Sequence, residues 1–401
     1  MSNTLKLGNG KWATGKDTVL GYNSENNNIK PLPFSFSRAS SGTVINKDGL
    51  IETVGTGEPR IDFKDNTKGA LLLEPTRINL VANSNFQSGW SVLSGGSITQ
   101  NQSISPDGTQ NAAILSGDGV NPNAAYTFIN VTTQEYVYSM FAKKGSEHIL
   151  RMKGFSGGAN GNVEFNLING TIETSSDGTF SNEKIEDYGN GWYRCSVKIT
   201  VTSSGSKTFG FNREAIVSGD LFSVYGVQLE QGSYATSYIP TSGSAVTRVG
   251  DVCNNGANEQ VINSTEGVLY AEISALANDG TDKVISLNSG SFNNRVQITY
   301  TSVSNQISAI VQSNAVYYFN ATTILSNTLQ INKIAIKYKQ NDFALWVNGI
   351  EIAVDISGNT PIGLNNLDFS VSNVANFYGN VKDVRVYNTA LTNQELIALT
   401  Q

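Results

Sequence analysis

Apolar and polar residues alternate in short runs along most of the chain, which is the pattern of strands that bury one face. The runs are rich in β-branched and aromatic residues and are separated by Gly, Asn and Asp. Such residues break strands and form turns. Sustained helical periodicity is missing before the last ten residues, so the pattern predicts an all-β protein.

Three hairpins are expected at Asp48-Gly49, Asn169-Gly170 and Asn348-Gly349. Both residues of such pairs accept positive φ, as a two-residue type I′ turn requires. The third turn also predicts a register, in which one set of side chains faces the core and Trp346 points the other way, towards solvent or a second layer. Counted outwards from the loop, the expected core-facing pairs are Val347 with Ile350, Leu345 with Ile352, and Phe343 with Val354.

One short helix is predicted at the C-terminal end. Thr392 as N-cap and Glu395 three residues later form a capping box, and Leu391 with Leu396 supplies a hydrophobic staple. A segment of about two turns is not stable alone, so this helix is expected to dock on a sheet.

Composition suggests where the domains begin and end. The first region, residues 1–80, is rich in turns, and residues 248–264 form a polar linker. Between and after them, residues 81–247 and 265–401 each have the length of one β-sandwich. The predicted fold is two consecutive β-sandwich (jelly-roll) domains after an N-terminal segment, closed by one short helix.

Charge and rare residues limit the possible functions. The net charge is -6 with no Lys/Arg cluster along the sequence, which argues against nucleic-acid binding. No apolar run is long enough to span a membrane, and the N-terminus lacks a secretory signal, so we expect synthesis in a cytoplasm without membrane insertion. Cys195 and Cys253 cannot build a disulfide framework. His148 is the only histidine, which excludes a multi-histidine metal centre.

Eight stretches of the sequence stand out. In chain order they are LKLGNGKWATGKDTVLGYN, KPLPFSFSRASSGTVINKDGLIETVGTGEPRIDF, KGALLLEPTRINLVANSNF, YVYSMFAKKGS, IEDYGNGWYRCSV, YGVQLEQGSYATSYIPT, INKIAIKYKQNDFALWVNGIEI and FYGNVKDVRVYNTALTNQELIALT. Together they resemble bacteriophage structural proteins with lectin-like modules. The first three resemble the N-terminal segment of such proteins, the next three resemble a carbohydrate-binding-module-like jelly roll, and the last two are similar to laminin-G-like, concanavalin-A-like sandwiches.

This resemblance implies a virion component, a tail or head fibre or receptor-binding appendage, assembled in the host cytoplasm. Such proteins are usually homotrimers. Residues 1–80 would then attach to other virion proteins, and the sandwiches would bind bacterial or mucosal glycans for host adhesion. The chemistry of individual residues has to be weighed separately, because a fold does not specify a function.

Residue patterns for catalysis are weak. Glycan hydrolysis requires two facing carboxylates, and the E-x-D-x-x-E arrangement of concanavalin-A-like glucanases is missing, with Glu351 and Asp355 the nearest approach. There is no phosphate-binding loop of the Walker type. We therefore expect a non-enzymatic adhesion protein without a cofactor. A purely structural virion component and a polysaccharide hydrolase remain the alternatives.

Aromatic side chains are the candidates for sugar binding, since a sugar ring stacks on an exposed aromatic face. Trp346 is the first candidate, because the hairpin register turns it away from the core; the alternative is that the terminal helix or another subunit covers it. Trp90, Tyr317 and Tyr318 follow. Trp192, after a Gly-Asn-Gly turn, is expected in the core.

A structural calcium ion is the one metal that the sequence suggests. Calcium takes hard oxygen ligands, often at the rim of a sandwich. The loop NDGTDK offers Asp279 and Asp282 as weak candidates. Two carboxylates fall short of a full site, so an ordinary turn is the alternative.

Overall fold

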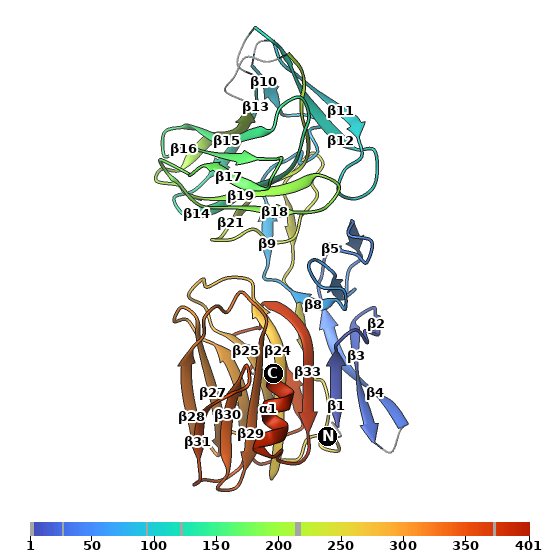
Figure 1. The fold of residues 1–401 in the computed structure, drawn as a ribbon, viewed down its shortest axis with the longest axis vertical. Helices are drawn as coiled ribbons and strands as arrows, with labels where there is room; N and C mark the ends of the chain where they lie inside the picture. Colours follow the sequence, from blue (N-terminus) through green and yellow to red (C-terminus); the bar gives the residue numbers. More distant parts are fainter. Residues whose placement is uncertain (1–3, 26–27, 94, 121–122, 213–217, 372–373) are drawn as a thin grey trace. The chain divides into compact units, whose positions relative to one another are not determined.

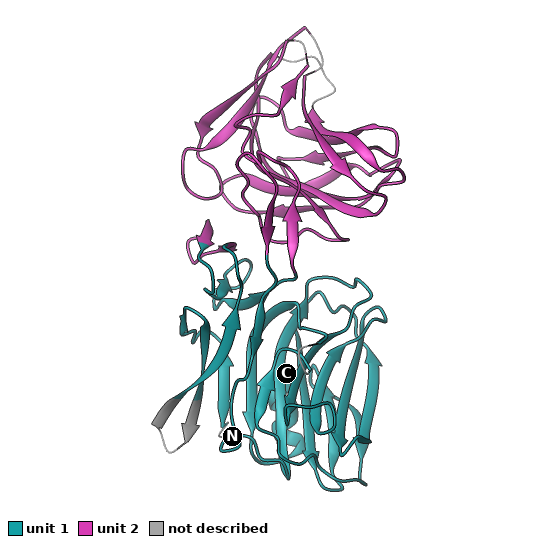
Figure 2. Cartoon of the chain, turned by 180° about the vertical axis from the view of Figure 1, so that it is seen from behind, with its two compact units in different colours: residues 1–41, 54–75, 249–401 teal, residues 42–53, 76–248 magenta. Residues whose placement is uncertain are grey.

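The computed structural model describes residues 4–25, 28–93, 95–120, 123–212, 218–371 and 374–401. The chain divides into two compact units (Figure 2). Unit 1 comprises Met1–Ser41, Val54–Pro75 and Val249–Gln401, and unit 2 comprises Gly42–Thr53 and Thr76–Arg248. Nearly all regular structure is strand, and the only helix of the described residues is α1 (Asn393–Thr400). The all-β prediction with one short C-terminal helix is confirmed.

Unit 1 is a sandwich of a twelve-stranded and a five-stranded antiparallel sheet (Figure 1). The first has the order β23-β4-β3-β1-β33-β24-β29-β30-β31 with β2, β7 and β8 at its side, and the second has the order β28-β27-β26-β25-β32. The strands of the first sheet are β1 (Leu5–Gly8), β2 (Thr14–Gly15), β3 (Thr18–Glu25), β4 (Asn28–Ser37), β7 (Arg60–Asp62), β8 (Ala70–Leu73), β23 (Val252–Asn254), β24 (Glu266–Ala275), β29 (Asn332–Lys339), β30 (Phe343–Val347), β31 (Ile350–Asp355) and β33 (Gly379–Tyr387). Those of the second are β25 (Lys283–Asn288), β26 (Arg295–Tyr300), β27 (Gln306–Ser313), β28 (Val316–Ile324) and β32 (Asn366–Asp368).

The N-terminal strands belong to this sandwich. Strand β33 pairs with β24 along one edge and with β1 and β8 along the other, for example through Leu7 opposite Val384 and Leu71 opposite Val381. All four of these side chains are in the core. Because these pairs join residues more than three hundred positions apart, no local pattern in the sequence could predict them.

The units therefore differ from the segments expected at residues 1–80 and 248–264. Most of the first segment extends the sheet of the C-terminal sandwich, and residues 42–53 belong to unit 2. The expected linker contributes β23, which pairs with β4, and buries Val261 and Ile262 in the core. Its polar composition reflects short turns between buried positions.

Unit 2 is a sandwich of two six-stranded antiparallel sheets. Its core lies between them and includes Leu150 and Phe209 from one sheet and Met140 and Val197 from the other. The first sheet contains β10 (Ser91–Val92), β13 (Ala124–Val131), β15 (Ile149–Ser156), β16 (Ala159–Asn166), β17 (Thr171–Thr174) and β20 (Gly205–Asn212). The second contains β11 (Ser97–Ser103), β12 (Ala112–Asp118), β14 (Glu135–Lys144), β18 (Phe180–Asp187), β19 (Trp192–Thr200) and β21 (Ser218–Gln231); two small ribbons pair β5 (Gly42–Ile45) with β6 (Ile51–Val54) and β9 (Arg77–Asn79) with β22 (Val246–Arg248).

A second, aromatic cluster of unit 2 contains Trp192. The indole packs with Phe141 and Tyr225 and donates from Nε1 to the Ile104 carbonyl oxygen at 3.1 Å. The preceding Gly189, Asn190 and Gly191 all have positive φ, which forms the tight turn. The prediction that Trp192 is a core residue is confirmed.

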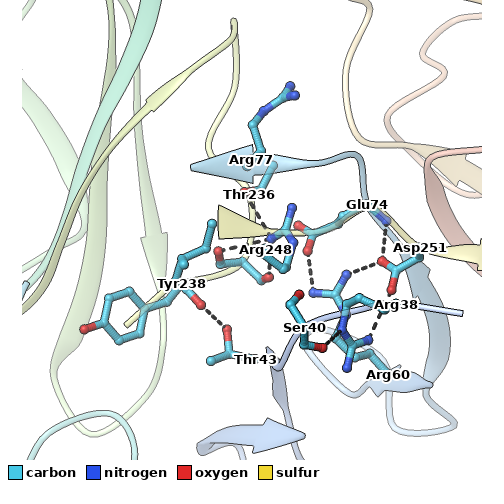
Figure 3. A network of polar contacts seen from close by, with 12 residues as sticks. Arg38, Ser40, Thr43, Arg60, Glu74, Arg77, Thr236, Tyr238, Arg248 and Asp251 are labelled. Carbon is cyan, nitrogen blue, oxygen red and sulfur yellow. Dashed lines mark hydrogen bonds and ion pairs between the residues drawn. The ribbon is translucent and has the colours of Figure 1, made fainter. Parts of the chain in front are cut away.

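Four charged side chains form a buried network in unit 1 (Figure 3). Asp251 accepts from Arg38 at 3.1 Å through Oδ1, and through Oδ2 it binds Arg60 and accepts from the Glu74 amide at 2.8 Å. Arg60 also donates to Glu74 at 2.5 Å. Burial of an ion is costly unless it is paired and hydrogen-bonded. The network therefore fixes three distant segments of the chain relative to one another.

All three expected hairpins form, with different turns. Only Asn348 and Gly349 both have positive φ, at 49° and 82°, as a type I′ turn requires. Asp48 and Asn169 do not have positive φ, and longer loops join the strands at these two turns. In the first loop the Asn46 amide donates to the Leu50 carbonyl oxygen, and in the second the Gly170 amide donates to the Asn166 carbonyl oxygen. An Asn-Gly or Asp-Gly pair thus located the turn but did not determine its type.

The third hairpin keeps the expected register for one pair only. Val347 lies opposite Ile350, but a β-bulge follows, so that Leu345 lies opposite Ala353 rather than Ile352. The three core positions predicted in β30 are buried, whereas Ile350 is 64% exposed. Strand β31 is the edge of its sheet, where bulges are common.

Helix α1 covers the outer face of the twelve-stranded sheet at β29 and β30 (Figure 1). Its capping box is present, with Thr392 and Glu395 bonded reciprocally. Trp346 is 4% exposed and packs with Leu391, Leu396 and Leu399. Trp346 is therefore not a platform for sugars, because the terminal helix covers that face.

The two cysteine thiols are buried and unbonded, Cys195 in β19 and Cys253 in β23. Burial raises the pKa of both thiols, and the charges of Asp251 and Asp368 raise that of Cys253 further. Since the thiolate is the nucleophile, we expect the native protein to resist a thiol-reactive dye at pH 8. Both cysteines should react after denaturation, and rapid modification of the native chain would contradict this prediction.

Candidate ligand-binding faces

The outer face of the five-stranded sheet of unit 1 carries a polar row with aromatic residues at its edge. Asn288, Arg295, Gln312 and Tyr317 are successive cross-strand partners on β25, β26, β27 and β28. Their neighbours along the strands, such as Val296, point into the core, so this row faces away from it. We call Arg295, Gln312, Tyr317 and the adjoining Phe292, Gln297, Asn320 and Thr322 the five-stranded face.

Two exposed rings enclose one guanidinium at this face. Arg295 Cζ lies 5.7 Å from the ring centroids of both Phe292 and Tyr317. The guanidinium donates to the Phe292 carbonyl oxygen and, at 3.3 Å, to the Tyr317 hydroxyl. Tyr317 is 54% exposed and Phe292 is 44% exposed. The rings are therefore held in place by Arg295 while part of their surface remains in contact with solvent.

Exposed polar side chains lie on the same side of the sheet as these rings. They are Asn320 and Thr322 of the edge strand β28. Arg295, Gln297 and Gln312 are buried beneath, so they support the face and are not accessible to a ligand. Exposed rings with exposed amide and hydroxyl groups beside them are the combination that a sugar can use, through its apolar ring face and its hydroxyls.

Unit 2 carries a second aromatic surface, which we call the six-stranded face. The ring centroid of Tyr126 on β13 lies 5.8 Å from that of Phe128 on the same strand and 6.4 Å from that of Phe155 on β15. Phe128 is 63% exposed and Phe155 is 39% exposed. Lys153 Nζ lies 5.1 Å from the Phe155 ring. Gly210 makes room for this cluster, because a Cβ there would lie 2.9 Å from Tyr126 Cβ and 3.1 Å from Phe155 Cε2.

The six-stranded face was missed by sequence reasoning. Its signal is present in the run AAYTFINV, where Tyr126 and Phe128 are two positions apart, and Ala125 and Ile129, on the other face of the strand, lie in the core. Period-two alternation places the two rings on the outer side. The contribution of Phe155 could not be foreseen, because β15 joins β13 only through β20.

Among the predicted sugar-binding residues, Tyr317 alone lies on an aromatic surface that is open. Tyr318 is shifted by a β-bulge towards the core and accepts from Asn359 at 3.2 Å through its hydroxyl. Trp90 is half-buried against Phe86, with centroids 4.7 Å apart, and donates from Nε1 to the Asn83 carbonyl oxygen at 2.9 Å. Trp90 thus packs on the core of unit 2.

The calcium candidates have other partners. Asp279 accepts from Lys283 at 2.7 Å and from Thr281, and Asp282 accepts from the Ser302 amide at 2.6 Å. Burial would raise the pKa of Asp279, but the hydrogen bonds from Lys283 and Thr281 hold it below the usual value. The described residues contain no group of three His, Cys, Asp or Glu side chains placed to hold a metal ion. They also contain no helix that is long and apolar enough to cross a membrane.

Unit 2 also contains a cavity of about 620 Å³ lined in part by Arg77, Thr132, Gln134 and Tyr136. Its polar groups are largely bonded to one another. The Tyr136 hydroxyl accepts from the Thr132 amide and from Gln134, each at 3.0 Å. Arg77 lies 5.2 Å from the Tyr234 ring and 3.8 Å from Glu230. The five-stranded face differs from this cavity in that its two rings, Tyr317 and Phe292, are exposed.

Comparisons with known proteins add little to this description. No family model matches the chain, and no curated protein matches it. Among solved structures it is similar to domains LG4-5 of the mouse laminin alpha1 chain, at 9% identity over 79% of this chain and 93% of that one, with a TM-score of 0.25. It is also similar to Trypanosoma rangeli sialidase, at 10% identity over 95% and 81% of the two chains, with a TM-score of 0.29. Such low scores carry no argument, and the sandwich assignment depends on the strand pairing alone.

Proposed function

We propose that this chain is a non-enzymatic bacteriophage virion protein that binds host-surface glycans through exposed aromatic faces of its sandwiches. The observation that carries the proposal is the five-stranded face, where the rings of Tyr317 and Phe292 are exposed on the same side as the polar side chains of Asn320 and Thr322. The six-stranded face offers a second surface of the same kind. The phage assignment is supported by the resemblance of the sequence stretches quoted above.

The wider proposal includes a homotrimer that is attached to other virion proteins through residues 1–80. It uses neither a cofactor nor bond-making chemistry. Affinity at one site should be weak, roughly millimolar to micromolar, and the many copies on a particle would raise the avidity. Analytical ultracentrifugation of the purified chain tests the trimer, and labelling of the protein in an imaged particle tests its place in a tail or head fibre.

Glycan arrays followed by calorimetry with any bound glycan test the adhesion proposal. We expect Tyr317→Ala to weaken binding about tenfold or more, because it removes the stacking surface and the Arg295 contact. Tyr317→Phe should retain most of the affinity, since it keeps the ring. Val303→Ala is the control and should leave binding unchanged, because Val303 is 52% exposed in the turn that follows β26, at the end of that strand opposite Arg295.

Phe128→Ala tests in the same assay whether the six-stranded face binds the glycan. If it alone weakens binding, the glycan site is the six-stranded face. Unchanged binding by the Tyr317→Ala/Phe128→Ala double variant would contradict the proposal. A folded trimer that binds no glycan would favour a purely structural role, and release of reducing sugar ends from host polysaccharide would favour a hydrolase.

A further inference from the structure

A cavity of about 330 Å³ lies on the outer face of the twelve-stranded sheet, beside the C-terminal end of α1. It lies within unit 1, on the other sheet from the five-stranded face. Three neighbouring strands, two loops and the last turn of α1 line it, and four of the lining side chains are cationic. Those that matter here are Lys68, Tyr270, Glu272, Lys333, Lys382 and Arg385.

Carboxylates neutralise three of these four cations. Lys382 pairs with Glu272 at 2.7 Å, and Arg385 pairs with the neighbouring Asp383 at 2.6 Å. Lys333 donates at 2.7 Å to a main-chain carboxylate oxygen of Gln401, the last described residue. Lys68 donates instead to Asn9 Oδ1 at 3.0 Å, so the cavity has one positive charge in excess, in a chain whose net charge is -6.

Further cations surround it. Lys6 lies opposite Arg385 on the adjoining strands β1 and β33. Burial lowers the pKa of Lys6, and although Asp383 acts in the opposite sense, the charges of Arg385, Lys11 and Lys68 lower it further. Uncompensated repulsion among cations is relieved when an anion binds between them.

We propose that this cavity binds an oxyanionic group, namely the sulfate, phosphate or carboxylate of an acidic saccharide. Lys68 is the principal ligand because no carboxylate competes for it, Lys333 supplies a second ammonium group that can exchange its Gln401 contact for the ligand, and Arg385 supplies a planar donor that matches an oxyanion. Tyr270, whose ring lies 5.5 Å from Arg385 Cζ, holds that guanidinium in position. A volume of about 330 Å³ accommodates a ligand no larger than a small saccharide.

Calorimetry with a short sulfated dextran, inorganic phosphate and an uncharged dextran tests this site. We expect the sulfated dextran to bind and the uncharged one not to bind at this cavity, with affinity falling as salt is raised from about 50 mM to about 500 mM. Lys333→Gln and Lys68→Gln should each weaken binding about tenfold. If phosphate binds as well as the sulfated dextran, the ligand is a free oxyanion rather than a saccharide.

Lys339→Gln is the matched control. Lys339 lies on the same strand and the same face as Lys333, six residues away at the other end of β29. Its substitution by Gln removes the same charge. Equal weakening by Lys333→Gln and Lys339→Gln would show diffuse attraction and would overturn the proposal, as would no binding of any anionic probe at low salt. Tyr317→Ala should not affect this site, so the two glycan proposals can fail independently. Unchanged melting temperatures confirm that the variants are folded.

Discussion

Asp251→Asn is expected to destabilise unit 1 by about 3 to 5 kcal/mol, the cost of breaking a buried ion pair by removing one partner. Asp251 bonds both Arg38 and Arg60, and all three side chains are fully buried. The neutral amide would leave the two guanidinium groups with Glu74 as their only carboxylate in the network. We therefore expect the melting temperature of unit 1 to fall by roughly 10 °C.

Scanning calorimetry measures this effect, and Asp65→Asn is the control because Asp65 also belongs to unit 1 and its side chain is 86% exposed. The transition of unit 2 should stay where it is, because the network belongs to unit 1. If Asp251→Asn and Asp65→Asn were equally stable, the network would not hold the N-terminal strands in place.

Trp346→Ala is expected to cost about 3 to 5 kcal/mol of unfolding free energy and to leave glycan binding unchanged. The indole fills the space between β30 and α1. Its Nε1 has no hydrogen-bond partner, so Trp346→Phe should lose much less, about 1 kcal/mol. Chemical denaturation measures both variants.

Binding measurements on the same variants separate the two roles of an aromatic residue. Tyr317→Ala should weaken glycan binding without a change in stability, and Trp346→Ala should do the reverse. Loss of glycan binding by Trp346→Ala at unchanged stability would mean that α1 moves away from the sheet and that the tryptophan is a binding residue after all.

Local patterns predicted the elements of this fold well. Alternation identified the strands, and Thr392 with Glu395 located the only helix of the described residues. At Asn348-Gly349 the predicted type I′ turn is also present, with positive φ at both residues. The register beyond that turn was predicted wrongly, because a bulge in an edge strand leaves no clear trace in composition.

The candidate sites were predicted less completely. Tyr317 was identified by its residue type, but its pairing with Arg295 and Phe292 depends on a cross-strand row and a loop. The basic cavity was not foreseen at all. Its cations are spread from Lys68 to Arg385, so the sequence contains no basic cluster, and only the pairing of β24, β29 and β33 brings them together.

By itself the sequence determined the all-β class, the turns and the terminal helix, since each depends on residues within a few positions of one another. Tertiary structure alone decided that the first strands complete the C-terminal sandwich, that α1 covers Trp346, and which faces stay open. The physical reason is that strand edges pair by hydrogen bonds between backbones, which are nearly the same for every residue. Which edges meet is therefore settled by burial of apolar surface over the whole chain.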